Sequence, residues 1–189
     1  MATKHTGLIE SMEHAVVGAV KGSGDVVKAT SDVVSSTLTA ILEDAGKVGA
    51  SATESAGRVA AETINGAARA GAHLGHVAKG TMIGVMRGTQ HVGTEAIATI
   101  GQTAGTVIDR TAAVGGKVEH AVTGLIEGAI HSAGAVGVSA EEAASAAAEG
   151  ALKAADKIGA TAVQTTRHAL TQTIAGVKVV LKAPFKDTH

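Results

Sequence analysis

The sequence predicts an all-α protein of long amphipathic helices, extended or folded as helical hairpins, without a conventional globular core. Three observations support this prediction. Polar and apolar residues recur every eleven positions, with no insertion or deletion from residue 10 to residue 186. The apolar positions follow helical spacing and not the alternation of a strand. Large core-forming side chains are scarce, with one Phe, no Trp and no Tyr among 189 residues.

The composition excludes several classes of function. The apolar residues are mainly Ala and Val, which bury little area each, and there are 25 Gly. Charge is balanced, with 16 basic and 17 acidic residues. Balanced charge and scarce aromatic rings argue against nucleic-acid binding, which needs a basic surface and, for single strands, stacking platforms. The chain has no Cys, which excludes disulfides and thiol chemistry.

Three segments follow one another along the chain: a lead-in at 1–9, the repeat region at 10–186 and a tail at 187–189. The lead-in contains no signal-peptide core. The longest stretches without a charged residue, 96–108 and 128–140, each hold 13 residues. A membrane-spanning helix needs about 20 apolar residues. We therefore expect a cytoplasmic protein, able to lie peripherally on a membrane or granule.

The eleven-residue repeat is clearest in two neighbouring columns. Every eleventh residue from Glu10 is polar in 15 of 17 cases, and every eleventh residue from Ile9 is large and apolar in 12 of 17. Three helical turns per eleven residues advance each residue by ~98°. The five apolar columns of the repeat then form one stripe along the helix, opposite the Glu10 column.

The stripe supplies the predicted contact residues, which would touch lipid or a partner helix. The members singled out are Leu38, Leu42, Ile64, Met82, Met86, Ile97, Ile108, Ile126, Ile130, Leu152, Leu170 and Ile174.

Longer periods of 22 and 44 residues lie on top of the eleven. Large residues recur every 44 positions at Leu38, Met82, Ile126 and Leu170. Glycine recurs every 22 positions, and we interpret these glycines as close-packing sites that accept a bulky side chain from a neighbouring helix. They are Gly49, Gly71, Gly93, Gly115, Gly137 and Gly159.

Small-xxx-small patterns also occur at Gly80, Gly84 and Gly88 and at Gly124 and Gly128. Such patterns let helix backbones approach closely. Because Gly is common in this chain, chance explains them about as well.

Preserved phase favours long uninterrupted helices, since turns between packed helices need not keep it. Hairpins that turn at the glycines remain an alternative if every turn keeps the register of the repeat. An isolated helix of this kind is weak, because each interior Gly costs about 1 kcal/mol relative to Ala. The stripe therefore needs a cover, either an apolar surface or further helices.

The repeat resembles those of synucleins and perilipins. Residues 77–81, VAKGT, resemble perilipin repeats, and residues 114–118, VGGKV, resemble synuclein repeats. The 22-residue doubling is similar to that of exchangeable apolipoproteins. The resemblance implies long helices lying on membranes or lipid droplets. Residues 176–185 are similar to the ends of uncharacterised bacterial proteins and imply no activity.

No catalytic residue, metal site or cofactor is predicted, and the protein is not expected to be an enzyme. Among the nine His, His73 and His76 are spaced to share a helical face. Several others occupy the polar columns, so solvated histidines are the favoured interpretation. Glu141 and Glu142 are interpreted in the same way, as part of a charged solvent face.

Two functions remain open. In the first, the protein is structural and its stripe coats a lipid, membrane or granule surface. In the alternative, it is a self-assembling helical scaffold (a bundle, tube or filament) with glycine and bulky side chains packed between copies. The expected partners are a lipid or other apolar surface, further copies of the chain in a homo-oligomer, and no nucleic acid.

Overall fold

The computed structural model describes residues 7, 11–12, 14–18, 25–45, 51–90 and 96–171, and the regular structure within these ranges is helical. The all-α prediction is therefore confirmed. The α-helices are α2 (Val26–Ala45), α3 (Ala52–Arg69), α4 (Leu74–Thr89), α5 (Ala96–Ala113), α6 (Val118–Ser132), α7 (Ala140–Ile158) and α8 (Ala160–Thr171). A short 3-10 helix, η1 (Ala133–Val136), follows α6 directly.

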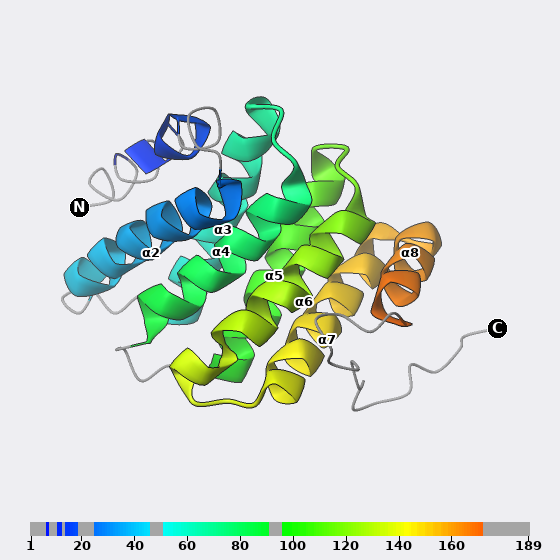
Figure 1. The fold of residues 1–189 in the computed structure, drawn as a ribbon. Helices are drawn as coiled ribbons and strands as arrows, with labels where there is room; N and C mark the ends of the chain where they lie inside the picture. Colours follow the sequence, from blue (N-terminus) through cyan, green and yellow to red (C-terminus); the bar gives the residue numbers. More distant parts are fainter. Residues whose placement is uncertain are drawn as a thin grey trace.

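The helices stack in two layers, and consecutive helices alternate between the layers (Figure 1). In one layer α2 packs on α4 and α4 on α6. In the other, α3 packs on α5 and α5 on α7, and α8 closes the stack against α6 and α7. Helices α2 to α7 therefore each pack most closely on a helix two places away along the chain, whereas α8 packs about equally on α7 and α6.

The 44-residue period coincides with one pair of helices. Helices α3, α5 and α7 begin at residues 52, 96 and 140, which are 44 residues apart, and α4 and α6 begin at 74 and 118, also 44 apart. Residues one period apart thus occupy equivalent places in neighbouring helices of one layer. Each 44-residue unit of the sequence therefore forms one helix pair, and the pairs stack on one another.

The described glycines of the 22-residue series lie in the turns. Gly71, Gly115 and Gly137 have φ near +71°, +71° and +73°, and Gly159 has φ near +135°. A side chain is strained at such angles, whereas glycine is not. A β-carbon at any of these four glycines would meet nothing within 4 Å. Within one chain these four glycines therefore do not act as close-packing sites and instead lie where helices end, whereas packing against a second copy stays a prediction; Gly49 and Gly93 lie outside the described residues.

Three of these turns share one hydrogen-bond pattern. The residue after the glycine donates its N–H to the carbonyl five residues earlier: Ala72 to Ala67, Gly116 to Thr111 and Val138 to Ala133. This is the pattern of a Schellman cap, which satisfies the last carbonyls of a helix.

The expectation of long uninterrupted helices is wrong for the described ranges, where the longest α-helix has 20 residues. The hairpin alternative describes the α3–α4 and α5–α6 pairs. The eleven-residue phase survives the described turns because their cap glycines are spaced by multiples of 22 residues, with 44 from Gly71 to Gly115 and 22 from Gly115 to Gly137 and from Gly137 to Gly159. Each turn therefore returns the chain to the same point in the repeat.

The absence of a conventional core is not confirmed either. One continuous cluster of buried apolar residues runs through the stack and includes Met12 and Val16 near the N-terminus. Alanines supply much of it, particularly in α7. A core of small residues becomes possible because the helices approach closely enough to leave little space to fill.

The close approach depends on the small-xxx-small patterns. A β-carbon at Gly84 of α4 would lie 2.7 Å from the carbonyl oxygen of Ser31 in α2. A β-carbon at Gly128 of α6 would lie 2.7 Å from the carbonyl oxygen of Lys79 in α4. Gly84 and Gly128 are 44 residues apart. A similar close approach of glycine to a neighbouring backbone therefore recurs from one helix pair to the next, with the partner carbonyl four residues later in the repeat for Gly128 than for Gly84.

Candidate functional sites

The predicted stripe residues are mostly covered by other helices of the same chain. Ile130 is half-buried, Ile97 is 40% exposed, and Ile174 lies outside the described residues. The buried members are Leu38, Leu42, Ile64, Met82, Met86, Ile108, Ile126, Leu152 and Leu170. The cover that the stripe requires is thus provided within one molecule, and in this conformation the buried members reach neither a lipid nor a second copy.

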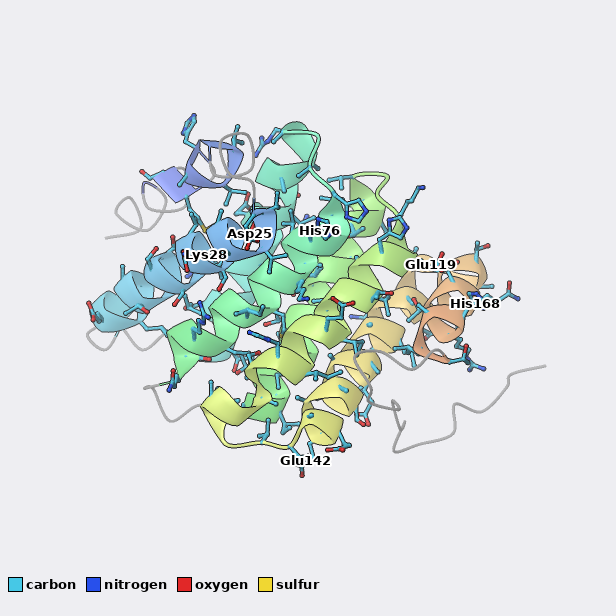
Figure 2. The ribbon with its side chains drawn as sticks, viewed as in Figure 1. Asp25, Lys28, His76, Glu119, Glu142 and His168 are labelled. Atoms are coloured by element: carbon cyan, nitrogen blue, oxygen red, sulfur yellow. The ribbon has the colours of Figure 1, made fainter. Side chains whose placement is uncertain are left out.

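Charged side chains project from the outside of the stack, as Lys28, Glu142 and His168 do in Figure 2. Some of them join neighbouring helices. The Lys79 amine of α4 donates to the Glu127 carboxylate of α6 at 3.0 Å. Arg87 of α4 lies 3.7 Å from the carboxylate of Asp32 in α2. Both pairs span two helices of one layer, so they add polar contacts to the glycine contacts beneath them.

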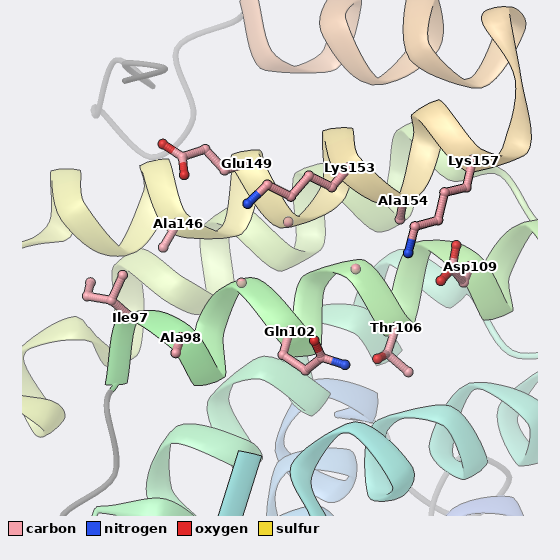
Figure 3. Close-up of a pocket in the computed structure, with 13 residues that line it drawn as sticks. Ile97, Ala98, Gln102, Thr106, Asp109, Ala146, Glu149, Lys153, Ala154 and Lys157 are labelled. Carbon is pink, nitrogen blue, oxygen red and sulfur yellow. The ribbon is translucent and has the colours of Figure 1, made fainter. Parts of the chain in front are cut away.

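A groove of about 380 Å³ lies between α5 and α7 (Figure 3). Its floor consists of backbone, because Gly101 and Gly105 of α5 face Gly150 of α7 without side chains between them. A β-carbon at Gly150 would overlap the Gly101 carbonyl.

The rim of the groove carries opposite charges. Figure 3 shows Lys157 of α7 extending toward Asp109 of α5, and Glu149 and Lys153 lie further along α7. The lining offers carboxylates, amines and the Thr106 hydroxyl as polar groups. The groove can therefore hold a polar ligand through charge and hydrogen bonds.

A second candidate is a group of three histidines, which we call the imidazole stack. His73 precedes α4, His76 lies in its first turn and His120 lies in the first turn of α6. The ring centre of His73 is 4.6 Å from that of His76 and 5.0 Å from that of His120. The His73 and His120 rings are stacked, with 20° between their planes.

The stack adjoins a hollow of about 340 Å³ that the α3–α4 and α5–α6 turns enclose, with Leu74 and Lys117 in its lining. All three histidines are exposed to solvent. Partial desolvation of the His73 ring by its neighbours lowers the pKa of His73 below the ordinary 6.5, and the charges of His76 and His120 lower it further. Lys117 acts in the same direction, and a backbone hydrogen bond partly opposes them. The surroundings therefore favour the neutral form of His73.

Sequence spacing placed His73 and His76 on one face and interpreted the histidines as solvated, and His73, His76 and His120 are indeed exposed. It did not bring His120 to the other two. The usable signal is that His76 and His120 are 44 residues apart, which places them at equivalent positions of neighbouring helices once the helix pairs stack. In the described part of the chain, no group of three His, Asp or Glu side chains is arranged to hold a metal ion.

Comparison with known proteins found no matching family model and no matching curated protein. Of the helices within the described ranges, none is both long and apolar enough to cross a bilayer.

Proposed function

We propose that the protein is a non-catalytic helical scaffold, a short stack of helix pairs held together where glycines let neighbouring backbones approach closely. The observation that supports this most is the recurrence of those contacts. Gly80 and Gly84 face α2, and Gly124 and Gly128, which lie 44 residues later, face α4. A fluid lipid surface does not require such shape matching, whereas helices that pack on one another do.

The eleven-residue repeat then has a specific role within this proposal. It keeps the apolar stripe of each helix directed into the stack after every turn, so that one repeated sequence unit builds successive helix pairs. Self-assembly of copies would extend the same stacking beyond one chain. We include a homo-oligomer in the proposal for that reason.

Circular dichroism and mass measurement by light scattering test the scaffold. The purified protein is examined with and without vesicles of neutral phosphatidylcholine. The proposal requires that the helix content without lipid equal that with lipid, and that the lipid-free protein unfold in a cooperative thermal transition. A chain that is unfolded in buffer and becomes helical only on vesicles would refute it. The measured mass separates a monomeric scaffold from one that assembles.

A second candidate, a lipid-surface coat, is favoured by the composition of the buried stripe. Buried hydroxyls of Thr30, Ser55, Thr103, Thr111 and Thr166 have no hydrogen-bond partner among the described residues. Each unsatisfied group costs about 1–3 kcal/mol, so these groups lower the cost of opening the stack. An opened stack would present its stripe to an apolar surface.

Vesicle flotation tests the coat. Co-flotation with neutral vesicles, together with faster amide exchange across the α4–α6 contact, would support opening onto lipid. Recovery of all the protein in the soluble fraction, with its exchange pattern unchanged, would eliminate this candidate.

A further inference from the structure

We propose that the imidazole stack of His73, His76 and His120 is an acid-sensitive contact that loosens α6 from α4 when its histidines are protonated. This inference goes beyond the scaffold function, because it concerns the condition under which two neighbouring helix pairs separate. The stack joins two helix pairs: His73 and His76 belong to the α3–α4 pair and His120 to the α5–α6 pair.

The position of the rings gives protonation a mechanical consequence. A β-carbon at Gly75 would lie 2.8 Å from the carbonyl oxygen of His120 and 3.1 Å from the His73 ring. One turn further along α6, the backbone of Gly124 meets the carbonyl of Gly75. The rings therefore lie beside the closest approach of α4 and α6. Repulsion between charged rings would act directly on that contact.

The surrounding charges oppose protonation. Lys117 lies at the N-cap of α6 and His73 at the N-cap of α4, and neither helix start has a capping hydrogen bond from a side chain. A positive charge is unfavourable at a helix N-terminus. Arg69 and Arg110 lie in the last turns of α3 and α5, and neither contributes to the lowered pKa of His73.

One acidic group lies in the same region. Glu119, in the first turn of α6, is exposed to solvent. The pKa of His73 responds to His76, His120 and Lys117, all of which lower it. Glu119 is not among the groups that shift the pKa of His73.

The direction of the pH effect follows from proton linkage. A histidine whose pKa is lowered by folding binds fewer protons in the folded state than in the unfolded chain. The stability that neutral His73 contributes is therefore fully present above the ordinary histidine pKa of 6.5. It is lost as the pH falls from 6.5 through the lower pKa of His73 in the folded protein. Acid should weaken the stack in a range where Asp and Glu remain mostly ionised.

Thermal unfolding of the full chain at several pH values between about 7.5 and 5.5, spanning the titration of histidine, tests the proposal. The wild type is expected to lose several degrees in melting temperature over this range. His73→Phe keeps a flat ring without a titrating group and should remove most of that loss. His168→Phe, at an exposed position in α8, is the matched control and should keep it. An equal loss in all three proteins would overturn the proposal.

Proton NMR of the wild type gives a second test that does not depend on the variant folding. The ring protons of His73 should titrate below the ordinary pKa of 6.5. Amide exchange at the start of α6 should accelerate as His73 becomes protonated. A His73 ring that titrates with a pKa at or above 6.5 would overturn the proposal.

Discussion

The backbone of Gly124 in α6 lies so close to Gly75 in α4 that a β-carbon at Gly124 would overlap the Gly75 carbonyl oxygen. Gly124 is a helical residue, and its replacement by alanine would ordinarily help the helix. Here the extra carbon would instead collide with a neighbouring backbone, which cannot rotate away as a flexible side chain can. The packing of α6 on α4 thus requires that residue 124 have no side chain.

Gly124→Ala should therefore destabilise the protein by about 1–3 kcal/mol, the usual cost of overpacking. Gly134→Ala is the matched control, since a β-carbon there would meet nothing within 4 Å. Urea unfolding followed by circular dichroism measures both. If Gly124→Ala equals or exceeds the wild type in stability, the close approach of α4 and α6 is wrong.

The turn at Gly115 gives a prediction of a different kind. Its φ of +71° suits glycine, and the space around it is open. Gly115→Ala should cost about 1–2 kcal/mol through backbone strain alone. Gly115→Asn should cost less, because Asn tolerates the left-handed region better. Equal stability of both variants and the wild type would show that the turn does not adopt this conformation.

Charges placed in the stripe should unfold the stack. Met82 and Ile126 are fully buried and occupy equivalent sites 44 residues apart. Met82→Glu or Ile126→Glu would leave an unpaired charge in the core at a cost of at least about 3 kcal/mol. Lys153→Glu, on the exposed side of α7, is the control. Loss of helix signal and of the cooperative transition in the first two variants only is the expected result.

The start of α7 contains a capping box. Ser139 Oγ accepts a hydrogen bond from the Glu142 amide, and the Glu142 carboxylate accepts one from the Ser139 amide. Ser139→Ala should cost about 1 kcal/mol, the typical value of a lost N-cap. Ser36→Ala, at an exposed site inside α2, should be neutral or slightly stabilising. Chemical denaturation of the two variants, run in parallel, compares these values.

Much of the local structure could be predicted from the spacing of residue types. The apolar columns identify Leu38, Met82 and Ile126 as residues of one face, and the structure buries that face. The glycine series marks regular positions, but a glycine serves equally a turn or a close contact. Only the backbone angle at Gly71 or Gly115 distinguishes the two.

The candidate sites were harder to predict, because each joins helices that lie far apart in the sequence. Asp109 and Lys157 line one groove although 48 positions separate them along the chain. His120 reaches His73 only because α6 lies against α4. Spacing along one helix contains no information about which helix will lie beside it.

The sequence by itself determined the helical class, the face that each helix must hide and the length of the repeating unit. These follow from local geometry, since side-chain direction depends only on position along a helix. The tertiary structure decided that the chain folds back on itself and that its own helices cover the stripe. It also decided that residues such as His73 and His120 meet. Those outcomes depend on how closely two backbones can approach, a property of pairs of helices and not of either one alone.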